Sequence, residues 1–505
     1  MPVMLKNEDG ELRSVSAFPS GGGTTSAGVN FARTLEDYRH VYKTYLQDAD
    51  LQDARARWPF VCIWDDHEFS DDCWQTQANY EPDATTDEPS QRRRLAASQA
   101  WFEFVPAILD DAEDLEGVAS EAHDFQPVSV EDAPYDQVVT VDEPNNVAVI
   151  SAITRYRRLR FGGHMDQVLT EARSYRSDHA LAEDVTKDNL LIVHPRVALP
   201  KDAVLAFDAG RTANDGAPAD VVLGLENSRK DSPPGTMLGE AQKAWWKATM
   251  LSSTTTSRIW GNAVPLLRIL LDSSHVSLVP NDLVLTGDAW DGYPSERREL
   301  MTFLKENEIT NVVSLSGDHH ANYAGVVMDD YDAPETSPVM VDLVTAAISS
   351  NSQFVEIASA FDSVRETFGD VAEPIIRVIT YDSTPLGGDD KAVVNLNTLI
   401  RYGSRAANVA ADTHDLEQIE AARDPAINSH LRYADARGIG YGLAHVSADG
   451  FSGTFVRVQR HFEPKGKASP GIVGTATFSV PVVARVEDTV LPEPVLTGKK
   501  PFPLA

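Results

Sequence analysis

The sequence predicts an α/β sandwich with a more antiparallel C-terminal part. Two patterns support this prediction. Short apolar runs alternate several times with stretches of helical periodicity, and strand patterns dominate from about Val339 onward. A third observation is size, since a chain of 505 residues with 42% hydrophobic residues can bury a large core.

The first predicted elements are two helices with a strand between them. Apolar residues spaced three and four apart predict a helix from Thr34 to Asp48, with Thr34 as its N-cap. A short apolar run over Trp58–Trp64 predicts a buried strand. A second helix is predicted over Gln91–Leu109, although Pro106 is a residue type that can end a helix early.

The rest of the chain alternates strands with helices. Residues 1–30 are predicted to be a flexible segment because they include consecutive glycines, and residues 110–146 are acidic and weakly periodic, as in a surface insertion. Helices are predicted after Gly239 and over 292–307. The predicted strands are 157–161, 167–170, 257–260, 310–316, 339–343, 376–380, 440–446, 454–459 and 475–483.

Composition excludes several classes of protein. The chain has 76 acidic and 44 basic residues and a formal charge of −32, so it repels nucleic acid and anionic membrane surfaces. Two cysteines exclude a disulfide framework and a four-cysteine zinc site. No apolar run reaches the roughly 18 residues of a membrane span, and the first residues lack the pattern of a secretory signal. The oligomeric state stays open.

Four ionisable residues, Asp65 to Glu68, directly follow the predicted strand that ends at Trp64. In α/β folds, ligands and catalytic groups gather at the carboxyl ends of strands. Adjacent carboxylates repel one another unless they are protonated or bind a cation, and carboxylates and imidazoles are ordinary metal ligands. The alternative is a solvated acidic turn before the next helix, and composition alone favours that alternative.

The motif Gly317-Asp-His-His320 follows a second predicted buried strand. Asp318 and His320 stand two residues apart, so an extended turn can direct both side chains to one side. A lone pair of histidines is more often a surface feature. Together with the turn at Asp65–Glu68, however, it makes a metal centre the better interpretation.

A third motif, Gly287–Pro294, contains Asp288 and Asp291, which are candidate ligands or substrate-orienting groups. Turn formation and helix capping explain the same residues equally well. The arginines of 155–160 and 173–176 can bind a phosphate, although pairing with the many carboxylates is the commoner role. A serine hydrolase is disfavoured because the sequence contains no Gly-x-Ser-x-Gly motif.

Taken together, these motifs resemble the alkaline phosphatase D (PhoD-like) family of calcineurin-like metallophosphoesterases. The resemblance implies a β-sandwich core flanked by helices (α-β-β-α), a phosphatase domain over residues 31–490 and a tail over 491–505. It rests on blocks in the family's order, from about Phe31 to Tyr323: Leu35-Glu-Asp-Tyr-Arg39, Leu51-Gln-Asp-Ala-Arg55, Trp64-Asp-Asp-His-Glu68, Arg160-Phe-Gly162, Arg173-Ser-Tyr-Arg176, Leu238-Gly-Glu-Ala-Gln242, Asp288-Ala-Trp-Asp-Gly-Tyr-Pro294 and Gly317-Asp-His-His320.

The resemblance also implies roles for single residues. Asp66 looks like the metal ligand of the family's first turn, and His67 looks like the imidazole that assists at the phosphate or the leaving group. Asp318 and His320 look like metal ligands from the second turn. The family implies Fe³⁺ and Ca²⁺, or another two-metal pairing, and hydrolysis of small phosphate monoesters and diesters. Two such ions hold the attacking and the leaving oxygen.

Two further residues, Asp65 and Asp291, are similar to supporting groups of the family's active site. Another difference is Glu171, where the family usually has Asp. Cys62 and Cys73 do not match the family's ligand cysteine.

The chain departs most from the family ahead of Phe31. There the family has a turn of the Gly-Asp-x-x-Tyr-Glu kind with further metal ligands, and it has a secretion signal, as periplasmic or secreted proteins do. Neither precedes Phe31 in this sequence. We therefore expect an N-terminally truncated phosphatase domain. The alternative function is an inactive PhoD-like fold that lost the bridging ligand.

Overall fold

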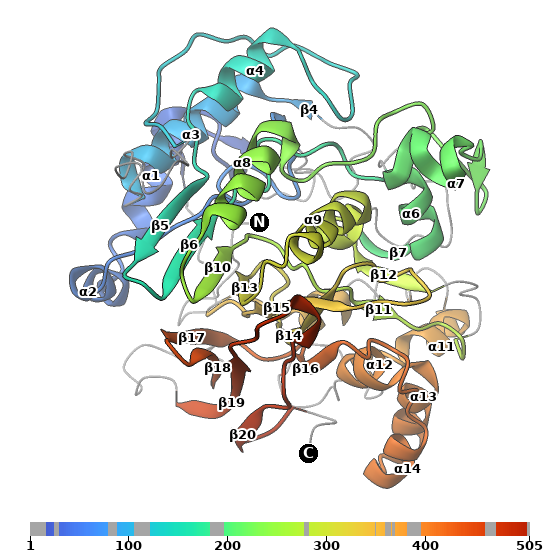
Figure 1. Cartoon of the computed structure of the whole chain (residues 1–505). Coiled ribbons are helices and arrows are strands. Elements are labelled where there is room, and N and C mark those ends of the chain that lie inside the picture. Colours follow the sequence, from blue (N-terminus) through green and yellow to red (C-terminus); the bar gives the residue numbers. More distant parts are fainter. Residues whose placement is uncertain are drawn as a thin grey trace.

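The computed structural model describes residues 17–24, 30–78, 88–105, 122–181, 196–276, 282–348, 350–358, 365, 369–380, 395–459 and 471–501. Two sheets pack face to face in these residues, and helices α8 (Gly239–Ser252) and α9 (Pro294–Glu306) cover the other face of the larger sheet (Figure 1). The predicted α/β class is confirmed. No helix in these ranges is long and apolar enough to cross a bilayer.

The larger sheet has seven strands in the order β16-β14-β15-β13-β10-β6-β5. Its four central strands, β6, β10, β13 and β15, run parallel, and the other three pair antiparallel with their neighbours. The loops after Leu169 of β6 and Ser316 of β13 therefore leave the same edge of the sheet. The strands are β5 (Arg157–Phe161), β6 (Met165–Leu169), β10 (Ser257–Gly261), β13 (Val312–Ser316), β14 (Asn322–Met328), β15 (Pro338–Val344) and β16 (Leu431–Asp435).

The smaller sheet is an antiparallel meander of β17 (Gly440–Ser447), β18 (Gly450–Val458), β19 (Ile472–Pro481) and β20 (Val495–Gly498). Alternate side chains of β18 and β19 are buried, as expected for a sheet with one face on a core. Phe455 and Phe478 of this sheet pack with Ile259, Val341 and Leu343 of the larger sheet. The predicted antiparallel C-terminal part and the sandwich of sheets are thus confirmed.

The N-terminal helices form a separate small core beside the large sheet. The helix predicted from Thr34 is α1 (Leu35–Tyr45), and a capping box between Thr34 and Asp37 fixes its start. Tyr42 of α1 stacks on Phe104 of α3 (Gln91–Phe104) with 5.5 Å between ring centroids. Helix α3 ends before Val105, which is extended because it precedes a proline. The predicted residues 106–109 lie outside the described ranges.

The other elements are a small sheet, short helices and short strands outside the two large sheets. A three-stranded sheet in the order β11-β12-β7 lies beside α6 and α12. The remaining helices are α2 (Ala49–Arg57), α4 (Pro144–Ser151), α6 (Lys201–Ala209), α7 (Ala213–Gly216), α11 (Glu373–Ile376), α12 (Leu396–Tyr402), α13 (Ser404–Thr413), α14 (Leu416–Ala421) and the 3₁₀ turns η1 (Gly210–Thr212), η2 (Trp290–Gly292), η3 (Gly369–Ala372) and η4 (Val486–Asp488). The remaining strands are β1 (Gly23–Thr24), β2 (Asn30–Phe31), β3 (Gln77–Ala78), β4 (Glu88–Pro89), β7 (Val197–Pro200), β8 (Val221–Val222), β9 (Leu225–Glu226), β11 (Leu270–Leu271) and β12 (Leu283–Thr286).

Two strand predictions are wrong. Residues 58–64 are extended but pair with no strand in the described part of the chain, and Trp58 is 62% exposed. Only Trp64 at the end of this run is fully buried, because the guanidinium groups of Arg94 and Arg155 lie over its ring at 4.2 and 4.1 Å. In the predicted strand 376–380, Ile376 is the last residue of helix α11, residues 377–379 form a turn, and only Thr380 makes a β-bridge.

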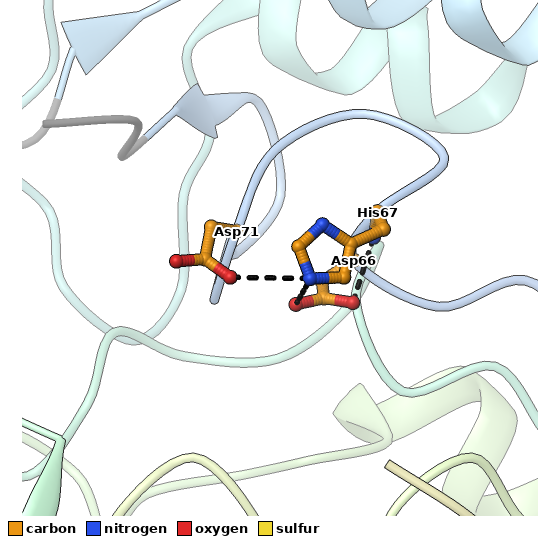
Figure 2. A group of neighbouring side chains, drawn as sticks. All are labelled: Asp66, His67 and Asp71. Atoms are coloured by element: carbon orange, nitrogen blue, oxygen red, sulfur yellow. Dashed lines mark hydrogen bonds and ion pairs between the residues drawn. The ribbon is translucent and has the colours of Figure 1, made fainter. Parts of the chain in front are cut away.

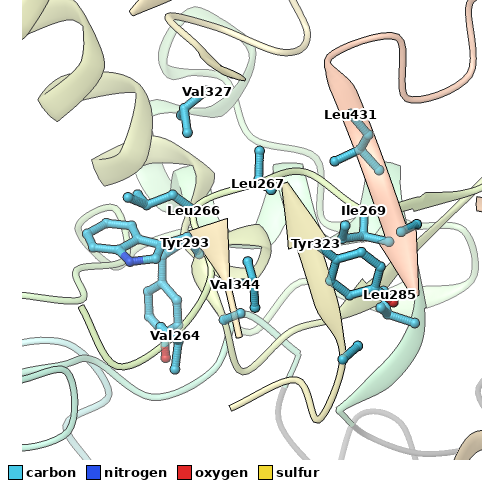
Figure 3. Packing of buried hydrophobic residues seen from close by; sticks show 14 of the residues in the cluster. Val264, Leu266, Leu267, Ile269, Leu285, Tyr293, Tyr323, Val327, Val344 and Leu431 are labelled. Atoms are coloured by element: carbon cyan, nitrogen blue, oxygen red, sulfur yellow. The ribbon is translucent and has the colours of Figure 1, made fainter. Parts of the chain in front are cut away.

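A buried segment without regular structure, residues 262–269, crosses the core between β10 and β11. Its backbone N–H groups need partners because water cannot reach them. The Asp342 carboxylate accepts from Leu266 N and Leu267 N at 2.8 and 3.3 Å, and the Asp291 carboxylate accepts from Ile269 N at 2.9 Å. Figure 3 shows four side chains of this segment, Val264, Leu266, Leu267 and Ile269. They pack among core residues of other parts of the chain, which include Tyr293, Tyr323 and Val344.

Candidate active site

Loops from four parts of the chain meet at the carboxyl edge of the large sheet. The turn 65–68 follows the extended segment that ends at Trp64, and the loop with Arg173 follows β6. Asp288 follows β12, and Asp318 follows β13 in a left-handed conformation with a φ of 64°. Because these loops meet around Arg173, acidic residues that lie far apart in the sequence become neighbours.

Three aspartates, Asp65, Asp66 and Asp318, form a group that we call the carboxylate cluster. Each offers a carboxylate oxygen, and these oxygens lie within 4.8 Å of one another. Asp66 is only 4% exposed, and the other two are half-buried. The structure thus brings together the two turns that the sequence analysis singled out, through three of their four acidic residues.

Burial and mutual repulsion raise the pKa of two of the three carboxylates in the cluster, although Arg173 lies beside them. Burial, with the charge of Asp66 beside it, raises the pKa of Asp65 to about 7. Burial and the charge of Asp65 raise the pKa of Asp318 well above its usual range. Burial also acts on Asp66, but His67 and Arg173 outweigh it and lower the Asp66 pKa. A bound cation would relieve this repulsion, so the donor set fits a hard, oxygen-preferring metal ion.

Arg173 is the fully buried cation that orders these carboxylates. Its Nε donates to Asp65 Oδ1 at 2.7 Å, and its Nη1 lies 2.8 Å from Asp288 Oδ2. Its Nη2 lies 3.7 Å from Asp318 Oδ1. One guanidinium therefore faces three carboxylates that come from three different loops.

Asp288 lies behind Arg173 and is fully engaged by positive and hydrogen-bonding groups. Arg176 Nη1 and His179 Nε2 lie 3.0 and 2.7 Å from Asp288 Oδ1. Burial opposes ionisation, but Arg173 and Arg176 hold the pKa of Asp288 well below its usual range. Burial and the arginines Arg196 and Arg176 lower the pKa of His179 to about 4. His179 was missed by the sequence analysis, since no motif marks its contact with Asp288.

His67 is on the open side of the site. Its side chain is 45% exposed, and Nε2 lies 3.3 Å from Asp71 Oδ1 and 3.8 Å from Asp66 Oδ2. Figure 2 shows the imidazole between these two carboxylates. Asp66, His67 and Asp71 form a second group whose ligand atoms lie within 4.8 Å of one another, so Asp66 belongs to both groups.

His320 lies on the same turn as Asp318 but belongs to neither of these groups within the described ranges. Its Nδ1 lies 3.1 Å from Glu356 Oε1. Burial lowers the His320 pKa, but the Glu356 carboxylate outweighs burial and raises it. Glu356, which the sequence analysis did not single out, is therefore the direct partner of this predicted ligand.

Asp291 is placed in different surroundings, away from the carboxylate cluster. Its Oδ1 accepts from Arg268 Nε and Arg297 Nη1, both at 2.8 Å. Burial opposes ionisation, but the two arginines lower the pKa of Asp291. Through Ile269 N, the same carboxylate also fixes the buried segment 262–269. These contacts assign Asp291 a structural position.

Comparison with known proteins agrees with the fold and with the motifs. A solved structure entitled "Structure of PhoD" superposes on 100% of this chain and 66% of its own, with a TM-score of 0.55 and 18% identity, which is a likeness of fold. Alkaline phosphatase D of Bacillus subtilis (strain 168) is 25% identical over 334 residues. That alignment covers 66% of this chain and 43% of the relative, so the chain matches less than half of the relative's length.

The family comparison covers the loops that form the site. A family profile described as PhoD-like phosphatase matches residues 13–373, which include both turns of the carboxylate cluster, Arg173 and Asp288. This range is more than half of the 505 residues. The chain therefore belongs to the PhoD-like phosphatase family.

Proposed function

We propose that this chain is a metal-dependent hydrolase of small phosphate esters. The observation that carries this proposal is the carboxylate cluster, in which two turns far apart in the sequence present three acidic side chains to one point. Membership of the PhoD-like phosphatase family supports the reaction class. Both observations favour a working enzyme over an inactive fold.

The residues divide into cation-holding and proton-transferring groups. Asp65, Asp66 and Asp318 would hold a cation, and Asp66 can serve a second one because it also belongs to the group with His67 and Asp71. Fe³⁺ and Ca²⁺ are the pairing that the family implies, and another divalent pairing is the alternative. Such ions supply charge neutralisation at the phosphate and activation of water.

His67 is the proton donor in this proposal. Its exposed imidazole stands beside the carboxylate cluster and can reach a leaving oxygen from the open side. Arg173 does not face solvent, so its role is to hold Asp65 and Asp318 in position. The net charge of −32 favours small esters over nucleic acid as substrates, since a polyanion would be repelled.

The central test measures hydrolysis of p-nitrophenyl phosphate and bis-p-nitrophenyl phosphate at alkaline pH with Fe³⁺ and Ca²⁺ supplied. We expect Asp66→Asn and Asp318→Asn to lower kcat/KM by at least about 100-fold, because each removes a cation-holding carboxylate. Asp220→Asn is the matched control, since Asp220 is exposed and pairs only with Lys230 among the described residues. Wild-type rates in the Asp318 variant would refute the assignment.

Elemental analysis of the purified protein separates the enzyme from an inactive fold. We expect bound metal in the wild-type chain and less in Asp66→Asn, because Asp66 belongs to both groups of ligand atoms. A chain that holds no metal after incubation with either pairing, and that hydrolyses neither ester, would establish the inactive alternative.

The role of His67 is tested with leaving groups of different basicity. His67→Asn should slow hydrolysis of phenyl phosphate by roughly 100-fold and that of p-nitrophenyl phosphate much less, since only the poor leaving group needs a proton. Equal losses with both esters would exclude proton donation by His67.

A further inference from the structure

A cavity of about 370 Å³ lies away from the carboxylate cluster, beside the β14–β16 edge of the large sheet. It shares no lining residue with the cluster or with the loops around Arg173. Its volume falls in the range of roughly 300–1,000 Å³ that is typical of small-molecule sites. Apolar side chains, including Leu270, Val326 and Met328, line it together with charged ones.

Part of the charge on the cavity wall is already neutralised. Arg268 donates from Nε to Asp291 Oδ1 at 2.8 Å and from Nη2 to Asp332 Oδ2 at 3.0 Å. Arg297, behind the wall, also donates to Asp291. Two acids, Asp291 and Asp332, are thus matched by two arginines. His430, a further wall residue, has a pKa of about 4 because it is buried, so it is neutral near pH 7.

The cavity wall has two further cationic side chains, Lys201 and Arg432, in excess of these matched pairs. Lys201 Nζ forms an ion pair with Asp332 Oδ1 at 3.6 Å, which is longer than a hydrogen bond, and Arg268 already donates to the same carboxylate. Arg432 is held in place by hydrogen bonds from Nε to Leu491 O at 3.1 Å and from Nη1 to Ser429 O at 2.7 Å. In the described part of the chain, its Nη2 makes no hydrogen bond.

The sign of this excess charge runs against the rest of the molecule. The whole chain has 76 acidic and 44 basic residues, whereas three cationic side chains and one carboxylate line the cavity. A low-dielectric wall with a local positive excess attracts an anion despite a negative net charge. An arginine whose other nitrogens are already fixed loses little conformational freedom when it binds an oxyanion.

We propose that this cavity binds a small organic anion, with its oxyanion group between Lys201 and Arg432 and its apolar body against Leu270 and Met328. Carboxylates and phosphates or phosphonates share the required oxyanion chemistry, and the experiment below distinguishes them. This site does not depend on the proposed phosphatase reaction, because none of its residues belongs to the carboxylate cluster.

Isothermal titration calorimetry of the full chain with phenylacetate and with phenylphosphonate tests the proposal. The two probes have similar bodies and differ in their oxyanion. We expect at least one probe to bind one saturable site in the wild type and equally in Asp66→Asn, which disables the carboxylate cluster. Lys201→Gln and Arg432→Gln should each weaken binding about tenfold. Lys230→Gln, which alters an exposed lysine elsewhere, is the matched control and should change nothing.

A steric variant provides a second route that does not alter charge. Ala426 is an exposed residue of the cavity wall, so Ala426→Phe should fold normally and should abolish probe binding by filling the space. Thermal unfolding checks that each variant is folded. The proposal is overturned if neither probe gives a saturable signal, or if Ala426→Phe and Lys201→Gln bind the probe as tightly as the wild type does.

Discussion

Asp291 and the carboxylate cluster are both buried acidic groups, yet their surroundings balance their charge in opposite ways. Asp291 has two arginines and a backbone N–H for a single carboxylate, and its pKa is lowered. The cluster has three carboxylates facing one another around one shared arginine, and two of its three pKa values are raised. The charge of Asp291 is balanced within the protein, whereas the cluster would need an added cation, as we propose, to balance its charge.

This difference separates a structural acid from a ligand-binding acid more clearly than sequence does. Asp288 and Asp291 stand three residues apart in one motif and are equally buried. Arginines contact both carboxylates, so both have a positive partner for their charge, in contrast to the three carboxylates of the cluster, which share one arginine. The number of cationic and N–H partners per carboxylate is therefore the useful criterion, and four experiments test it.

The largest effect is expected at Asp291. Asp291→Asn leaves Arg297 buried without its counter-charge and leaves Arg268 with Asp332 alone, which should lower the free energy of unfolding by about 3–5 kcal/mol. Urea unfolding followed by tryptophan fluorescence measures this, with the exposed Asp220→Asn as control. A loss below about 1 kcal/mol would mean that Asp291 is not the structural acid that its contacts indicate.

Removing a charge from the carboxylate cluster should change the stability of the metal-free protein much less than removing the charge of Asp291. Asp318→Asn keeps the shape of the side chain and removes a repelled charge, so the metal-free protein should change by no more than about 1 kcal/mol. A cation at 100 times its Kd should stabilise the wild type by about 2.7 kcal/mol, and the variant should lose most of this gain. Thermal unfolding with and without metal measures both. Equal metal-induced shifts in the two proteins would contradict the prediction.

Asp37 is a second acid whose charge is balanced within the protein, and the pH dependence of stability tests this. It accepts hydrogen bonds from Ser20 N and Oγ, Arg33 N and Thr34 N, which lower its pKa from 3.8 to about 2 against the opposing effect of burial. The ionised form is favoured by folding, so this stability is present above about pH 4 and is lost as the pH falls towards 2.

Its expected contribution is on the order of 2 kcal/mol, since the shift is nearly two pKa units. Unfolding free energies measured from pH 6 to pH 2 in the wild type and in Asp37→Asn should converge at the acid end. If the two plots of unfolding free energy against pH stayed parallel over this range, the ionised Asp37 carboxylate would not be stabilised by its hydrogen bonds.

The smallest effect on stability is expected at His67. Its side chain is 45% exposed and stands beside two carboxylates at the open side of the site. His67→Asn should change the free energy of unfolding by no more than about 0.5 kcal/mol, although it should impair activity. Urea unfolding checks the stability, and a loss above about 1.5 kcal/mol would show that His67 is mainly structural.

Local patterns predicted those parts of the fold that depend on neighbouring residues. The capping box of Thr34 and Asp37 lies within four residues, and the helix begins where it was expected. The turns at Asp66 and Asp318 were identified because each follows an apolar run. The rule that ligands gather at strand ends applies to Asp318, which follows β13, but not to Asp66, whose preceding segment is no strand in the structure.

Contacts between distant segments could not be predicted. The run that ends at Trp64 has the composition of a strand, but its burial comes from two arginines of other elements instead of a neighbouring strand. The partners His179 of Asp288 and Glu356 of His320 likewise belong to segments without a recognisable motif. Such partners become visible only once the fold is known.

The segment 262–269 has a consequence for dynamics and engineering. Although it is neither helix nor strand, carboxylates of Asp342 and Asp291 hold its amide groups inside the core. Its amide protons should therefore exchange with solvent as slowly as those of the central strands, unlike those of surface connections. Insertions, which surface connections usually tolerate, should prevent folding here. This connection behaves as part of the core.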